Sequence, residues 1–157
     1  MLIGWAAVLE HLPTSRISPK HQVTLPRSTR GLSGIEEGAE VCVLPHAMPL
    51  RDGSKLTTLV VLTEEELRKR EDAIRARDDI PVATKERRIA MINGRVRQLS
   101  VDRQRRVVLP QHFVKMLQLE RDVYMFVNNQ SVMVWHPQDW LRYNQDLEEE
   151  DADDLML

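Results

Sequence analysis

The stretch VDRQRRVVLP, residues 101–110, places three arginines within four positions and then runs into Val-Val-Leu-Pro. Residues 17–26 read ISPKHQVTLP and follow the same order: a polar, basic turn, a short strand-like run and a proline. Valine and threonine favour strands. Proline suits the start of a helix, where its missing N–H is not needed. Each stretch therefore predicts a turn, a short strand and then a brief helix.

The two stretches belong to longer halves that align with each other. At an offset of 84, Ile17, Val23, Leu25 and Pro26 fall on Val101, Val107, Leu109 and Pro110. Residues 59–70 align with residues 132–143 at an offset of 73, which leaves an insertion of 11 residues, PHAMPLRDGSK, in the first half. Units of this length indicate a tandem repeat of two strand-rich units, not a solenoid.

Each unit is expected to contain a hairpin and a closing helix. AEVCVL and LTTLVVL form the first hairpin, with Asp52-Gly53 in its loop, and DVYMFV and SVMVW form the second. Thr63 and Glu66 make a capping box ahead of the first closing helix, and Pro137 opens the second. Asn93-Gly94 predicts either the C-cap of a connecting helix or a hairpin turn.

The predicted fold class is α+β and strand-rich. The first repeat takes residues 1–80 with an extended hairpin loop, a connecting helix takes 81–94, and the second repeat takes 95–144. Residues 145–157 are predicted to be an acidic, disordered tail. The apolar opening MLIGWAAVL is too short to span a bilayer, so we expect a strand or short helix there and no membrane partner.

The charge of the chain is unevenly distributed. The formal net charge is −2, but residues 145–157 hold seven acids and no Lys or Arg, so removing them leaves +5 for residues 1–144. A basic body suggests that the protein binds a polyanion. The tail either confers solubility or competes with DNA for the basic face.

The sequence contains none of the familiar motifs of catalytic or metal-binding sites that we looked for. A single cysteine, Cys42, excludes a disulfide framework and a Cys-rich zinc site. The five histidines show no H-E-x-x-H motif or i,i+4 pair, and the chain has no Gly-rich phosphate loop and no G-x-S-x-G. We therefore expect no enzyme, no metal and no cofactor.

With both halves aligned, the chain resembles the MraZ family within the wider AbrB/SpoVT group. ISPKHQVTLP is similar to the AbrB-type signature, and VDRQRRVVLP resembles the MraZ signature of Asp, three residues, Arg, an apolar run and Pro. VWHPQDW resembles the end of a MraZ repeat. The first half departs from the pattern with Ser18 and Gln22 in place of Asp and Arg. His21 and Arg105 stand where the family commonly has glycine.

The resemblance implies two tandem swapped-hairpin β units of the double-psi-barrel type, each followed by a helix. It implies an oligomer, with a ring among the expected assemblies, that binds repeated promoter elements in double-stranded DNA and represses transcription in the cytoplasm at the nucleoid. Two alternatives stay open. One is an AbrB-like antitoxin or phage-type regulator with a protein partner, and the other is a ring-forming structural protein.

The candidate DNA-binding residues lie in the two basic turns. Three cations in one turn are costly to bury, so most should face solvent or a partner, and arginine forms forked contacts with phosphate and guanine. Arg95, Arg97 and Arg103 alternate along an expected strand. Asp102 should hold Arg106 or close the turn, and Pro26 and Pro110 should support the motif. The candidate DNA contacts are Arg16, Lys20, His21, Gln22, Arg97, Arg103, Arg105 and Arg106.

Overall fold

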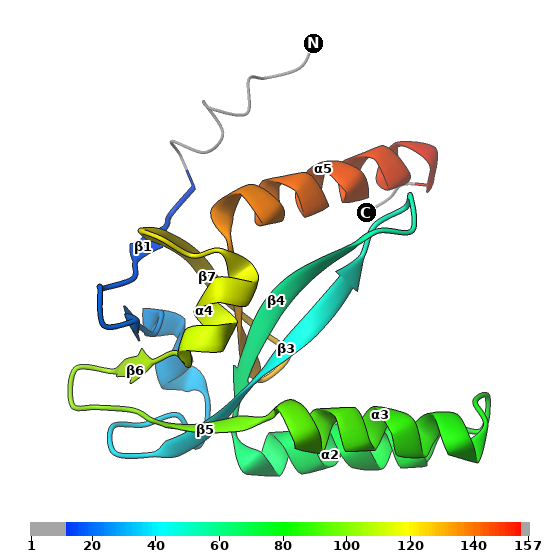
Figure 1. The fold of residues 1–157 in the computed structure, drawn as a ribbon, viewed down its shortest axis with the longest axis horizontal. Coiled ribbons are helices and arrows are strands. Elements are labelled where there is room, and N and C mark those ends of the chain that lie inside the picture. Colours follow the sequence, from blue (N-terminus) through cyan, green and yellow to red (C-terminus); the bar gives the residue numbers. More distant parts are fainter. Residues whose placement is uncertain (1–11, 155–157) are drawn as a thin grey trace.

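The fold is a strongly curled antiparallel sheet with helices at its ends and along one side (Figure 1). The computed structural model describes residues 12–154, with side chains as far as Glu149. The opening stretch, expected as a strand or short helix, lies outside the described residues. The strand-rich α+β class predicted from the sequence is confirmed. Six strands follow the order β1-β7-β8-β4-β3-β5, and β2 and β6 form a separate ribbon.

In the sheet, each half keeps its own hairpin together, and its leading strand lies beside the hairpin of the other half. The first half supplies β1 (Ser15–Arg16), β2 (Gln22–Thr24), β3 (Glu40–Pro49) and β4 (Lys55–Leu62). The second half supplies β5 (Arg97–Ser100), β6 (Arg106–Val108), β7 (Asp122–Asn128) and β8 (Ser131–Trp135). β1 pairs with β7, and the equivalent β5 pairs with β3. The leading strand of each half therefore extends the hairpin of the other half.

The β2–β6 ribbon joins equivalent positions of the two halves. Val23 faces Val107 in the antiparallel register, and both are 1% exposed. The same core contains Ile17 with its equivalent Val101, and Leu25 with its equivalent Leu109. Backbone bonds from Leu25 N to Arg105 O (2.9 Å) and from Leu109 N to His21 O (2.8 Å) lengthen the ribbon at both ends. The aligned residues of the repeat thus form one core.

The 11-residue insertion lengthens the first hairpin and does not form a long loop. β3 and β4 pair from Cys42↔Leu62 to Pro49↔Lys55, and only residues 50–54 form the turn, with Gly53 at a φ of 90°. The predicted extended loop is therefore wrong. β3 pairs with β5 only over residues 40–43, so beyond Val43 it is an edge strand. Proline is tolerated on an edge, which explains Pro45 and Pro49.

The short helices follow the two prolines of the motif. Pro26 caps the 3₁₀ helix η1 (Arg27–Gly31), and Pro110 caps α4 (Gln111–Leu117). Both prolines lie immediately before the first helical residue, where φ is already near that of a helix and no N–H is needed.

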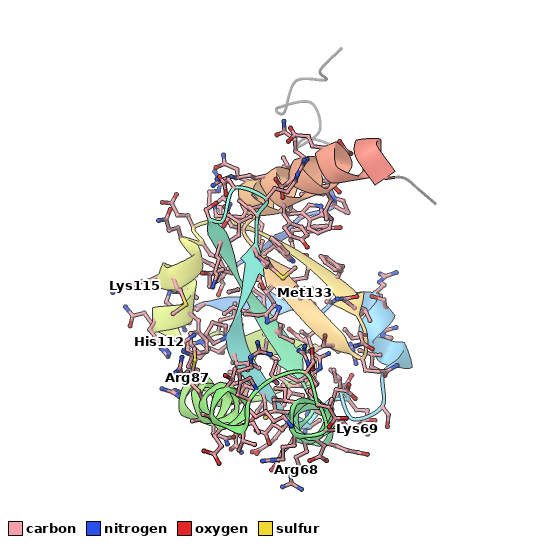
Figure 2. All side chains as sticks on the ribbon, turned by 90° about the vertical axis from the view of Figure 1, so that its right-hand side faces the viewer. Arg68, Lys69, Arg87, His112, Lys115 and Met133 are labelled. Atoms are coloured by element: carbon pink, nitrogen blue, oxygen red, sulfur yellow. The ribbon has the colours of Figure 1, made fainter. Side chains whose placement is uncertain are left out.

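Helices α2 (Glu64–Arg75) and α3 (Val82–Arg95) lie side by side at one end of the molecule (Figures 1 and 2). The predicted capping box is present, since Thr63 Oγ1 accepts from Glu66 N at 3.1 Å. α3 runs through Asn93 and Gly94 to Arg95, so neither the predicted C-cap nor the alternative hairpin turn forms. Val96 N still donates to Ile92 O, and β5 begins at the next residue, Arg97. No helix in residues 12–154 is long and apolar enough to cross a bilayer.

Helix α5 (Pro137–Asp154) begins at the predicted proline but continues well past residue 145. Residues 145–154 are therefore helical where a disordered tail was predicted. Leucine, glutamate and alanine favour helices, and Asp146 Oδ2 accepts from Arg51 N in the β3–β4 turn at 3.0 Å. The start of α5 is anchored by an aromatic cluster of Tyr124, Phe126, Trp135, Trp140 and Tyr143.

We expect Val23→Ala and Val107→Ala each to lower the free energy of unfolding by about 2 kcal/mol, because each removes two methyl groups from one buried contact. Urea denaturation at fixed protein concentration should show one cooperative transition for the wild type and both variants. Two separate transitions would mean that the halves unfold independently.

Candidate nucleic-acid interface

Two turns with the same hydrogen-bond pattern precede the ribbon strands. In turn 1 (residues 18–21), Ser18 Oγ accepts from Lys20 N at 3.2 Å and from Gln22 N at 3.0 Å. In turn 2 (residues 102–105), Asp102 Oδ1 accepts from Gln104 N and Arg106 N, both at 2.8 Å. Ser18 therefore accepts the same two backbone hydrogen bonds in turn 1 that Asp102 accepts in turn 2. It does so although the MraZ signature has Asp at this position.

The last residue of each turn has a left-handed backbone. His21 has a φ of 64° and Arg105 a φ of 61°. A side chain in this region costs roughly 1 kcal/mol or more, whereas glycine adopts it freely. Because neither position is glycine, each turn loses some conformational free energy, which the hydrogen bonds between β2 and β6 must offset.

Asp102 also holds the side chain of Arg106. Its Oδ2 accepts from Arg106 Nε at 2.8 Å, so this carboxylate makes both of the contacts that the sequence offered as alternatives. The hydrogen bond from Arg106 N, followed by the Arg106 side chain and Gln104 N, lowers the pKa of Asp102. Stability from Asp102 is therefore present above the ordinary aspartate pKa of about 3.9. It is lost as the pH falls through the lower folded-state pKa.

A groove of about 590 Å³ gathers arginines from three elements. We call it the basic groove. It is lined by Arg16 of β1, Arg106 of β6 and Arg121 just before β7, together with Gln22 and Thr24 of β2. Glu120 also lines it and partly offsets the positive charge. The structure thus brings together Arg16, Gln22 and Arg106 of the sequence candidates.

Arg121 was missed by sequence reasoning. In the sequence it lies between Glu120 and Asp122, a mixed-charge run typical of a solvated turn. Its position follows from the β1–β7 pairing, in which Arg16 faces Asp122 and Ile17 N donates to Arg121 O at 2.9 Å. Only this long-range pairing brings Arg121 beside turn 1, so no local signal could have identified it.

The other turn residues differ in whether their side chains face solvent or the interior. Lys20 and Arg103 are exposed. Arg105 points inward: Nη1 donates to Ile35 O at 3.3 Å, and Nη2 donates to Thr29 Oγ1. Thr29 is fully buried in η1. The Arg105 guanidinium therefore links turn 2 to the first half.

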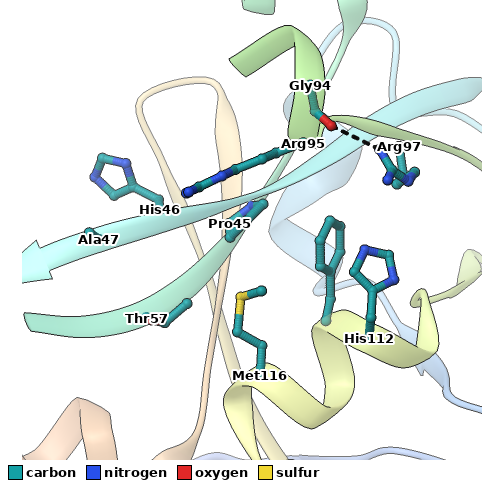
Figure 3. Close-up of a pocket in the computed structure, with 10 residues that line it drawn as sticks. Pro45, His46, Ala47, Thr57, Gly94, Arg95, Arg97, His112 and Met116 are labelled. Atoms are coloured by element: carbon teal, nitrogen blue, oxygen red, sulfur yellow. Dashed lines mark hydrogen bonds between the residues drawn. The ribbon is translucent and has the colours of Figure 1, made fainter. Parts of the chain in front are cut away.

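Arg97 lies away from the turns, in a second pocket of about 410 Å³ (Figure 3). The pocket is also lined by Arg95, His46, His112 and Met116. Arg97 Nη1 donates to Val96 O at 2.9 Å and to Gly94 O at 3.4 Å. Arg95 ends α3 and Arg103 lies in turn 2, so the predicted alternation of these arginines along one strand is wrong. The helix ends at Arg95, one residue beyond the predicted end at Gly94.

Within residues 12–154 no group of three or more His, Cys, Asp or Glu side chains is placed to hold a metal ion. Cys42 is buried, and burial raises the pKa of its thiol. Desolvation by burial, with a smaller effect from Arg70, lowers the pKa of His46. Among the described residues, the groups placed to bind a partner are therefore arginine side chains and the backbones of the two turns.

A protein-family model described as "MraZ protein, putative antitoxin-like" matches residues 92–156. Residues 92–156 are thus similar to the MraZ family. The match includes turn 2, the ribbon strand β6 and the hairpin of β7 and β8. The resemblance to MraZ predicted from the sequence is thereby supported. MraZ is a regulatory and generally DNA-binding family, not an enzymatic one. A search of curated proteins found no match.

Replacing Asp102 separates its bonds to the backbone of turn 2 from its bond to the Arg106 side chain. We expect Asp102→Ala to lower the free energy of unfolding by about 1–2 kcal/mol, since two backbone donors and Arg106 lose their acceptor. Asp102→Ser should cost less, because Ser18 satisfies the same two backbone donors in turn 1. Ser18→Ala is the matched variant in the other half. Equal costs for Asp102→Ala and Asp102→Ser in urea denaturation would contradict this account.

Proposed function

We propose that the protein is a DNA-binding transcriptional regulator of the MraZ type. It acts as a repressor, binds short repeated promoter elements as an oligomer, and works in the cytoplasm at the nucleoid. The observation that carries the proposal is the outward face of the β2–β6 ribbon. Gln22, Thr24, Arg106 and Val108 alternate there with the buried Val23 and Val107. The exchange of β1 and β5 between the halves supports a tandem swapped-hairpin architecture.

The size of the ribbon suits the major groove of DNA. Each strand has three residues and so spans about 10 Å at roughly 3.4 Å per residue. The major groove is about 12 Å wide and admits a two-stranded ribbon. Because β2 and β6 are antiparallel, turn 1 and turn 2 lie at opposite ends of the ribbon. Each turn would then approach one phosphate backbone at the edge of the groove.

The outward side chains have the chemistry needed to read bases. Arginine pairs with guanine O6 and N7, glutamine pairs with adenine, and threonine or valine methyl groups contact the thymine methyl group. Asp102 orients Arg106 through Nε, which leaves the terminal nitrogens of the guanidinium for a base. Val108, at 49% exposure, is one of the few large apolar side chains on the described surface, which is unusual unless it meets a partner.

Phosphate contacts would come from cations around this face. Lys20 and Arg103 are exposed at the two turns, and Arg16 and Arg121 border the basic groove. His21 in turn 1 could add a further contact. The net charge of +5 on residues 1–144 favours a polyanionic partner. Binding should therefore weaken steeply with salt.

An antitoxin-like regulator that acts with a protein partner is the second candidate, and the description of the matching family favours it. Footprinting on DNA upstream of its own gene separates the candidates. Short repeats spaced by about 10 bp, one helical turn, would support docking of several subunits on one face. No binding even at low salt, together with a co-purifying toxin, would favour the antitoxin. Assembly without DNA or partner would favour a structural protein.

Arg106→Ala should weaken operator binding by about 1–3 kcal/mol and relax sequence preference if Arg106 reads a guanine. If it holds a phosphate, the loss should be uniform and the salt slope should fall by about one. Gln22→Ala should leave the slope unchanged, because an amide neutralises no phosphate. Titrations at several salt concentrations, with the oligomer checked first, test this. A larger loss for Gln22→Ala would place the dominant contacts in the first half.

The neighbouring Arg103 and Arg105 provide a matched pair. Arg103→Ala should reduce the salt slope by about one, because its exposed side chain can reach a phosphate. Arg105→Ala should leave the slope unchanged and lower the free energy of unfolding, because it removes the bonds to Ile35 and Thr29. An unchanged slope for Arg103→Ala with a reduced slope for Arg105→Ala would contradict the assignment.

A further inference from the structure

A groove of about 580 Å³ lies between the β3–β4 hairpin and helices α2 and α3. We call it the apolar groove. Its apolar lining comes from both strands and both helices, and α3 itself has no buried residue. Met91 of α3, which lines the groove, is 44% exposed. The apolar residues that line it include Leu44, Val60, Leu62, Leu67, Ile74 and Ile92.

The rim of the apolar groove is cationic. Lys55, Arg70, Arg88 and Arg95 line it, and the lining contains no acidic residue. Within residues 12–154 neither Lys55 nor Arg95 takes part in a salt bridge. Arg88 acts only at longer range on Asp79, whose pKa it helps to lower. This surface therefore fits an acidic segment that also carries apolar side chains.

The C-terminal part of α5 has that composition. Residues 148–154 hold six acids, and Leu155, Met156 and Leu157 follow them. Glu148 and Glu149 are exposed, and among the described residues their carboxylates bond within the helix, to Asn144 at 3.4 Å and Gln145 at 3.5 Å. Six acids in seven residues at the C-terminal end of a helix oppose its dipole, so a cationic partner would stabilise them.

We propose that the apolar groove binds the acidic C-terminal segment, residues 148–157, of a second copy of this chain. Within one copy, the described part of α5 lies away from the apolar groove. The aromatic cluster anchors α5 at the end of the molecule opposite α2 and α3 (Figures 1 and 2).

This contact joins two different surfaces, so it is heterologous. Each copy donates one segment and offers one groove, which builds a closed ring or an open filament. The inference rests on the oligomer of the proposed function and names the interface that forms it. It does not depend on DNA binding, and assembly can be measured without DNA.

The first experiment reverses charge in the groove. Arg88→Glu/Arg95→Glu should weaken assembly at least tenfold at about 50 mM salt, measured by sedimentation and light scattering. Arg68→Glu/Arg87→Glu is the matched control. It changes the net charge equally on the same two-helix unit, but neither residue lines the groove. The control should assemble like the wild type, and circular dichroism should show that all variants are folded.

The second experiment reverses charge in the segment and mixes the variants. Glu148→Lys/Glu149→Lys alone should also assemble at least tenfold more weakly. Mixed in equal amounts with Arg88→Glu/Arg95→Glu, it should form heterodimers, because the native groove of one variant then meets the native acidic segment of the other. Recovery in the mixture is a readout that misfolding cannot produce.

Each failure has a distinct meaning. A wild-type chain that is monomeric at micromolar concentration overturns this inference and the oligomer of the proposed function together. A wild-type oligomer that the groove variant leaves as intact as the control overturns this inference alone. Removal of residues 148–157 that leaves assembly unchanged but tightens DNA binding also overturns it, and would show that the segment competes with DNA.

Discussion

The antiparallel contact between β2 and β6 is the interaction on which the rest of the structure depends. Val23 meets Val107 across it, and Leu25 and Leu109 continue the same core on either side. Three-residue strands cannot form a stable sheet alone, so neither half can build this ribbon without the other. The exchange of β1 and β5 follows from the same constraint, since each leading strand is carried across to the hairpin of the opposite half.

This shared core lets the two halves diverge at the surface. Turn 1 keeps its backbone bonds with Ser18, and turn 2 keeps them with Asp102. The difference lies in the side chain that follows, because only Asp102 can also hold an arginine by charge. Both turns retain the left-handed residue before the strand. The ribbon geometry is therefore common to the halves, whereas the positive charge in its face comes from Arg106 of the second half.

The exchange also explains how distant residues come to share a site. Arg16, Arg106 and Arg121 belong to three separate segments, and two strand pairings bring them to one groove. The same folding turns Arg105 inward to Thr29, so neighbours in the RQRR run have different environments. The extended hairpin and the α2–α3 pair lie outside this symmetric centre and add the apolar groove.

Local patterns in the sequence predicted the repeat, the two turns, the capping box at Thr63 and the proline starts of α4 and α5. Each depends on residues within a few positions of one another, so spacing alone is informative. The same reasoning failed for the loop around Pro45, the end of α3 at Gly94 and the tail beyond residue 145. Around Pro45 the chain forms an edge strand, and at Gly94 the helix continues. Beyond residue 145 the helix also continues, and Asp146 contacts Arg51.

The sequence by itself determined that the chain has two related strand-rich units whose aligned apolar residues recur at a fixed offset. It also determined that arginines precede the second ribbon strand, and that two signatures resemble MraZ. Only the tertiary structure decided that the halves exchange strands, that Arg121 joins Arg16 and Arg106, and that Arg105 turns away from solvent. The physical reason is that hydrophobic periodicity is a local property, whereas strand pairing and the direction of a long side chain depend on partners far away in the chain.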